Sequence, residues 1–101
     1  MTLVLAFVLL QSPATDALRR VEELGAKGDA KAAIALLMEA SRRFPAEPEV
    51  YLLWAQLYLR GDRPEPALEA AARALEIRPG HPRGHFLKGV ALIKLGRHVA
   101  A

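Results

Sequence analysis

His81 and His85 stand four residues apart, the spacing that could place two imidazoles on one helix face for a metal ion. Pro82 lies between them, and no acidic residue follows Glu76 to provide a nearby third ligand. Two ligands are too few for a site of this kind. The chain has no cysteine, which excludes thiolate ligands and a cysteine nucleophile. We therefore expect no metal and no cofactor.

Catalytic groups are equally sparse. Ser12 and Ser41 are the only serines, and neither lies in a nucleophile-elbow motif. Gly84 and Gly89 are isolated and form no phosphate-binding loop. The closely spaced carboxylates fall on expected polar faces or in a loop, at Glu22, Glu23, Glu47 and Glu49. The sequence therefore predicts a protein that is not an enzyme.

Aromatic side chains could stack on nucleic-acid bases, but their spacing points elsewhere. Tyr51, Trp54, Ala55 and Tyr58 recur at i, i+3, i+4 and i+7, which is one face of a helix and favours a core role. Phe86 is then the one aromatic residue placed to face a partner. Nucleic-acid binding is accordingly disfavoured.

Charge is unevenly spread along the chain. All eleven acidic residues precede residue 77, whereas residues 77–101 carry five of the fourteen lysines and arginines and all three histidines. Such asymmetry indicates either an acidic partner or a solvated helix face near a chain end. Both interpretations stay open at the level of sequence.

The chain repeats itself at an offset of 34 residues, which places Pro45 on Pro79 and Ala33 on Ala67. Gly61 comes one residue before the position that this offset gives for Gly28, which predicts a lengthened turn in the middle unit. Apolar spacing and turn residues divide each unit into two helices. The expected helices are 15–26, 30–43, 48–59, 64–77 and 82–94, with a further one beginning at 98.

Local signals support these boundaries. Asp29 is a natural N-cap for the second helix. Pro48, Pro64 and Pro82 fall in first helical turns, where a missing N–H costs little. Alanine and glycine at matching positions allow two helix axes to approach closely.

Residues 3–10 form an unbroken apolar run at the N-terminus. The run is too short to span a bilayer, which needs about 20 residues. It has the length of the apolar part of a signal peptide, although no lysine or arginine precedes it. Segment 1–14 is therefore a signal peptide, an apolar cap on the first unit, or a remnant of a longer protein. Export to a periplasm follows from the first interpretation, and a cytoplasmic location from the others.

The repeat pattern resembles that of the tetratricopeptide repeat family. Residues 48–81 carry the resemblance best, through Tyr51, Trp54, Ala55, Tyr58, Ala67, Ala74 and Pro79. The resemblance implies an all-α fold of antiparallel helix hairpins, stacked as a short right-handed α-solenoid of about 2.5 units. The repeat domain would cover residues 15–101, with units at 14–47, 48–81 and 82–101.

Family members of this kind are scaffolds that bind a peptide or a partner helix in a concave groove formed by the first helices. Carried over residue by residue, the groove comprises Leu18, Glu22, Glu49, Leu52, Gln56, Leu59, Arg60, Arg83, Phe86, Val90, Ile93 and Lys94, with Thr15 and Ala26 beside them. Its apolar members would form a central strip, acidic at one end and basic at the other.

The third unit departs from the family pattern. Lys88 stands where a large apolar residue is usual, as does Arg20 in the first unit, and the chain stops as the last helix begins. Stacked repeats need their final apolar face covered. The alternative function is therefore structural assembly, in which the uncapped third unit self-associates or extends a larger array.

Overall fold

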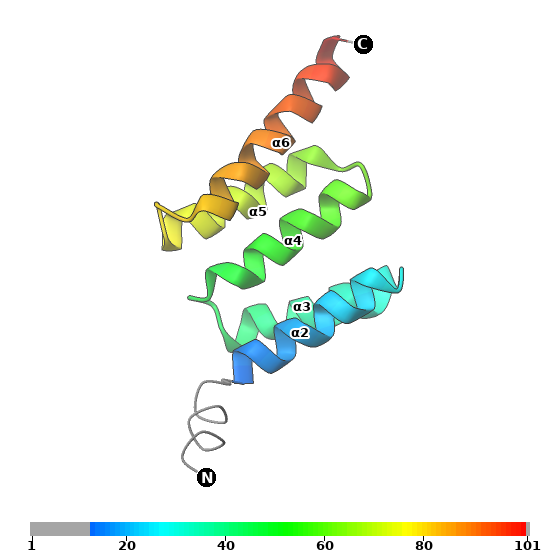
Figure 1. Cartoon of the computed structure of the whole chain (residues 1–101), viewed down its shortest axis with the longest axis vertical. Helices are drawn as coiled ribbons and strands as arrows, with labels where there is room; N and C mark the ends of the chain where they lie inside the picture. Colours follow the sequence, from blue (N-terminus) through cyan, green and yellow to red (C-terminus); the bar gives the residue numbers. More distant parts are fainter. Residues whose placement is uncertain (1–12, 101) are drawn as a thin grey trace.

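The computed structural model describes residues 13–100, which form five α-helices and no strand. In chain order the helices are α2 (Pro13–Ala26), α3 (Ala30–Arg43), α4 (Pro48–Arg60), α5 (Pro64–Ile77) and α6 (Pro82–Ala100). They follow one another along the long axis of the molecule (Figure 1). The all-α prediction is confirmed, whereas the apolar run at 3–10 lies outside the described residues.

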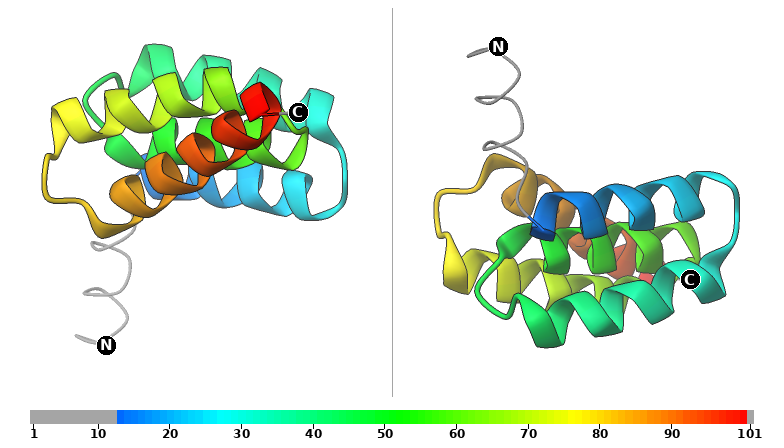
Figure 2. Two further views of the ribbon diagram at one scale, coloured as in Figure 1. Left: turned by 90° about the horizontal axis from the view of Figure 1, so that it is seen from above. Right: turned by 90° about the horizontal axis from the view of Figure 1, so that it is seen from below.

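The helices form two layers, with α2, α4 and α6 in one and α3 and α5 in the other (Figure 2). Two hairpins result, α2 with α3 and α4 with α5, and α6 packs on α5 and α4. Helix α4 touches all four other helices, which makes it the centre of the stack.

The turns inside the two hairpins have the same hydrogen-bond pattern. After α2, the N–H of Asp29 donates to the carbonyl of Leu24 at 2.9 Å, and that of Gly28 donates to Gly25 at 3.1 Å. After α4, Arg63 donates to Tyr58 at 2.8 Å and Asp62 to Leu59 at 3.1 Å. This is the Schellman pattern, which needs a left-handed residue at its centre. That residue is Gly28 (φ 82°) in one turn and Asp62 (φ 56°) in the other.

The predicted lengthened turn in the middle unit is therefore wrong. Gly28 and Asp62 are 34 residues apart, and residues 27–29 and 61–63 connect their helices with equal lengths. Aspartate is one of the few residues that visit the left-handed region at modest cost. Gly61, which suggested the extra residue, caps α4 with a negative φ of −85°.

The core has two clusters that meet at α4. The first joins α2, α3 and α4 and contains Val21, Leu37 and Leu53. The second joins α4, α5 and α6 and contains Leu52, Ala55 and Leu87 along with Ala71 and Ala74. Leu37 and Leu52 are completely buried. A continuous core of this kind is what holds stacked hairpins together.

Helix α6 differs from the sequence prediction at its C-terminal end. It runs unbroken from Pro82 to Ala100, whereas a turn near Gly96 and a new helix at 98 were expected. Glycine lowers helix stability by only about 1 kcal/mol relative to alanine, so it ends a helix mainly where other contacts favour a turn. Within the described residues, α6 has no following helix to turn back against.

Gly28, which is exposed, and Gly89, which is half-buried, give a matched test of this backbone. A Cβ at Gly28 or Gly89 would meet no atom within 4 Å, so neither Gly→Ala change creates a clash. Gly28 has a positive φ and Gly89 is helical. We expect Gly28→Ala to lower the free energy of unfolding by about 1 kcal/mol and Gly89→Ala to raise it by up to about 1 kcal/mol. Urea denaturation followed by circular dichroism measures both, and equal effects would contradict the turn geometry.

Candidate functional groove

A groove runs between α2 and α4 and consists of two adjoining pockets of about 320 and 250 Å³. Glu22 and Leu53 belong to both pockets and connect them. The larger pocket also contains Val21, Gly25, Ala26, Gln56, Leu57 and Arg60. The smaller also contains Thr15, Leu18, Arg19, Glu47 and Glu49. Both helices belong to the layer that the sequence predicted to line a concave face.

The larger pocket has an apolar floor and charged walls. Val21 and Leu53 are almost fully buried beneath it. A Cβ at Gly25 would come within 3.3 Å of both the Arg60 Nη1 and the Leu57 Cδ2. The absence of a side chain at Gly25 therefore allows these two side chains of α4 to lie against α2.

The smaller pocket is mainly acidic. Glu22, Glu47 and Glu49 contribute three carboxylates, and Arg19 contributes the one guanidinium among its lining residues. Arg60, by contrast, belongs to the larger pocket. A chain segment lying along the groove would therefore pass from an excess of negative charge to a mixed environment.

The structure brings together most of the groove residues predicted from the first two units. Leu18, Glu22, Glu49, Gln56 and Arg60 line the pockets. Leu18 is only 8% exposed and contributes mainly to the core beneath them. The prediction from the family's groove positions missed five residues that complete the lining, namely Arg19, Gly25, Glu47, Leu53 and Leu57. Helical spacing from the predicted residues could have found Gly25 and Leu53, which lie three and four positions from Glu22 and Glu49.

Leu52 and Leu59 were predicted to form part of the apolar strip of the groove; the prediction is wrong for Leu52 and stays a prediction for Leu59. Leu52 is completely buried in the cluster that contains Leu87 of α6. Leu59 is half-buried and packs against the same cluster. That cluster also contains Ala71 and Ala74 of α5, so Leu52 belongs to the core and not to the surface of the groove.

The predicted residues of the third unit lie outside the two pockets. Phe86 and Ile93 are exposed, at 67% and 59%, whereas Val90 and Lys94 are half-buried. Arg83 turns onto α4, where its guanidinium donates to the carbonyl oxygen of the Gln56 side chain. The contribution of the third unit to the groove therefore stays a prediction.

Glu49 ties α6 to α4 at the end of the groove. Its carboxylate accepts a hydrogen bond from Arg83 Nη1 at 3.4 Å, and its other oxygen lies 3.0 Å from His81 Nε2. His81 is 9% exposed, and its buried Nδ1 has no hydrogen-bond partner. His85 Nε2 lies instead 2.7 Å from the carbonyl oxygen of Pro79. The two histidines thus have different partners and do not form a pair.

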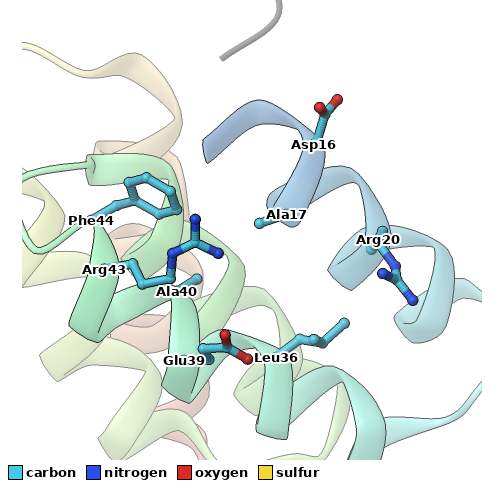
Figure 3. Close-up of a pocket in the computed structure, with 8 residues that line it drawn as sticks. All are labelled: Asp16, Ala17, Arg20, Leu36, Glu39, Ala40, Arg43 and Phe44. Carbon is cyan, nitrogen blue, oxygen red and sulfur yellow. The ribbon is translucent and has the colours of Figure 1, made fainter. Parts of the chain in front are cut away.

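A further pocket of about 370 Å³ lies between α2 and α3, on the hairpin end where α2 begins and α3 ends. Figure 3 shows residues of the two helices on its opposite sides. Its lining combines Ala17, Leu36, Ala40 and Phe44 with Asp16, Arg20, Glu39 and Arg43. The Arg43 guanidinium lies 5.1 Å from the centre of the Phe44 ring. Capping of the first unit by segment 1–14 stays a prediction.

Among the residues that the structure describes, no three histidine or acidic side chains come together as a metal site would require. None of the described helices is both long and apolar enough to cross a membrane.

The architecture is a short solenoid of stacked helix hairpins with a groove between consecutive first helices. The tetratricopeptide repeat model matches residues 25–90, which is more than half of the chain. Tetratricopeptide repeat protein 28 of Homo sapiens is 31% identical over 94 residues, which cover 93% of this chain and 4% of that protein. No solved structure was found to match the chain. The chain belongs to the tetratricopeptide repeat family, whose members are in general protein–protein interaction scaffolds.

The contacts of Glu49 predict its contribution to stability. Glu49→Ala would leave His81 Nε2 and Arg83 Nη1 without this partner, whereas Arg83 Nη2 keeps its hydrogen bond to Gln56. A polar group that is left without a hydrogen-bond partner costs about 1–3 kcal/mol when it is buried. Because Glu49 is partly exposed, we expect a loss of about 1 kcal/mol, at the lower end of that range. Glu49→Gln retains a carbonyl oxygen and should lose less. Urea denaturation of both variants provides the measurement, and wild-type stability for Glu49→Ala would show that the network contributes nothing.

Proposed function

We propose that the α2–α4 groove binds an extended segment of a partner protein. The observation that carries this proposal is the pair of adjoining pockets, joined by Glu22 and Leu53 over an apolar floor. Pockets of about 250–320 Å³ lie at or below the lower limit for small-ligand sites, so each fits a side chain rather than a whole helix. Successive side chains of an extended peptide could occupy both.

The lining defines the chemistry of that segment. An apolar side chain would lie over Leu53 and Leu57 in the larger pocket, where the floor excludes water. A basic side chain would approach Glu22 and Glu47 in the smaller pocket, where negative charge prevails. The favoured ligand is therefore a peptide with an apolar residue next to a lysine or arginine.

A matched pair of charge reversals tests the groove. Glu22 and Glu23 are adjacent exposed residues of α2, but only Glu22 lines the pockets. Short peptides selected from a random library on the wild-type chain should bind Glu22→Arg about tenfold more weakly, because like charges then face each other. Glu23→Arg should bind them like the wild type. Isothermal titration calorimetry measures the affinities.

Two further results bear on this proposal. Arg60→Glu, which adds negative charge to the opposite wall of the larger pocket, should not weaken the binding of a basic peptide. Selected peptides that carry no basic residue, or that bind Glu22→Arg as tightly as the wild type, would refute the groove as the binding site.

Self-association through the third unit, the alternative that the sequence leaves open, stays a prediction. It concerns α6 alone, since the groove lies between α2 and α4. If the chain dimerises through α6, Leu92→Glu or Ile93→Glu should produce a monomer, whereas Glu22→Arg should not. Sedimentation at several protein concentrations distinguishes these cases, and a wild-type monomer at tens of micromolar would argue against self-association.

A further inference from the structure

Arg83 of α6 holds the side chain of Gln56 in one orientation. Its Nη2 donates to the Gln56 Oε1, and its Nη1 donates to the Glu49 Oε2 at 3.4 Å. Because a guanidinium group can only donate hydrogen bonds, the Gln56 atom that faces it must be the carboxamide oxygen. The amide nitrogen of Gln56 therefore lies on the side of the carboxamide that is turned away from Arg83.

The Gln56 amide nitrogen is available for a further hydrogen bond. Gln56 is half-buried and lines the larger pocket, whereas Arg83 lines neither pocket. Within the described part of the chain, the Gln56 Nε2 has no hydrogen-bond partner, although it is not buried. Since the carboxamide oxygen is occupied, the group that a ligand in the larger pocket meets is a pair of N–H donors.

Few other groups of the larger pocket can donate a hydrogen bond. All its lining residues lie beyond the first turns of α2 and α4, so their backbone N–H groups bond within the helices. Among the lining side chains only Gln56 and Arg60 carry N–H groups, and Arg60 is exposed at the last residue of α4. A carbonyl group that the apolar floor shields from water needs a donor in place of that water. Gln56 lies one helical turn from Leu53 of the floor and can provide this donor.

We propose that Gln56 donates a hydrogen bond to a main-chain carbonyl of the bound segment, and that Arg83 positions Gln56 for this contact. The inference rests on the proposed function of the α2–α4 groove and adds that the groove recognises the extended backbone itself. Arg83 also offsets the charge of Glu49, which leaves Glu22 and Glu47 as the carboxylates available to a basic side chain. One contact to the backbone and one to the basic side chain would fix the position of the segment along the groove.

Gln56→Glu separates the donor from the other properties of the side chain. A carboxylate has nearly the same shape and still accepts from Arg83, but it has no N–H group. The added negative charge alone would favour the basic peptides selected on the wild-type chain. Loss of the donor acts in the opposite direction, and we expect these peptides to bind about tenfold more weakly. Titration calorimetry measures the change, and unchanged or tighter binding would overturn the proposal.

Nuclear magnetic resonance detects the contact directly. The sequence has two carboxamide side chains, Gln11 and Gln56, and no asparagine, so the ¹⁵N–¹H correlation spectrum shows two NH2 pairs. Either Gln11→Glu or Gln56→Glu assigns the pairs by removing one of them. We expect a selected peptide to move one proton of the Gln56 pair downfield, as a new hydrogen bond does. A Gln56 pair that does not move would overturn the proposal.

The ligand itself shows whether the acceptor belongs to the main chain. Replacing single peptide bonds of a selected peptide by esters weakens the carbonyl acceptor at each position without changing any side chain. One such ester should bind the wild type more weakly than the unmodified peptide does, whereas Gln56→Glu should bind the two equally. If every ester binds the wild type like the unmodified peptide, the acceptor is not in the main chain and the proposal fails.

The positioning role of Arg83 has a matched control in Arg78, an exposed arginine between α5 and α6. Arg83→Met releases the Gln56 carboxamide and should reduce both the downfield shift and the affinity, although residue 83 lines neither pocket. Arg78→Met removes the same charge and should leave both at their wild-type values. Equal results for the two variants would refute the positioning role.

Glu22→Arg separates the failure of this inference from the failure of the proposed function. Selected peptides that bind Glu22→Arg as tightly as the wild type bind outside the groove, and both proposals then fail. Peptides that bind Glu22→Arg more weakly, but bind Gln56→Glu at least as tightly as the wild type, refute the role of Gln56 alone. Thermal unfolding curves verify that each variant folds, and the wild-type spectrum tests the contact even if Gln56→Glu does not fold.

Discussion

The close approach of helices at alanine positions is the constraint on which the rest of the structure depends. Five alanines are 0% exposed, namely Ala33, Ala55, Ala67, Ala71 and Ala74. All but Ala67 belong to the clusters that join neighbouring helices. A methyl group allows the helix axes to approach until larger neighbours such as Leu37 and Leu52 fill the grooves beside them. A larger side chain at these seams would separate the helices and open voids along the core. The spacing of the hairpins, and with it the position of every surface residue, follows from these small side chains.

Helix α4 connects these closely packed helices to the α2–α4 groove. Val50 and Leu53 belong to the cluster shared with α2 and α3, whereas Leu52 and Ala55 belong to the cluster shared with α5 and α6. Leu53, which forms the floor of the groove, and Leu52, which shares a cluster with Leu87 of α6, are therefore neighbours in α4. The contacts of Glu49 with His81 and Arg83 strengthen the same connection from the polar side. A ligand in the groove would thus contact α4 at Leu53, next to residues of the same helix that pack on α5 and α6.

The sequence predicted the helices well because their signals are local. Asp29 caps α3 by accepting the N–H of Ala32 at 3.3 Å, and prolines begin α4, α5 and α6 as expected. The groove was predicted only in part, because helical periodicity defines the face on which a residue lies but not the element that covers it. Leu52 lies on the predicted face, and α6 buries it there. The left-handed conformation of Asp62 was missed for a related reason, since a glycine stands beside it and is the residue that such turns usually use.

The behaviour of α6 shows how far a local signal depends on tertiary contacts. Gly28 and Gly96 are two repeat lengths apart, yet only Gly28 ends a helix. Glycine permits a left-handed turn but does not enforce one, because it is also tolerated within a helix at a cost of about 1 kcal/mol. In the first unit, the turn is stabilised because it allows Ala33 and Leu37 of α3 to pack on α2. Helix α6 instead continues through Gly96 to Ala100, and among the described residues no other helix packs on it than α4 and α5. A glycine at the matching position is therefore compatible with either a turn or a continuous helix, and the packing of the neighbouring elements decides between them.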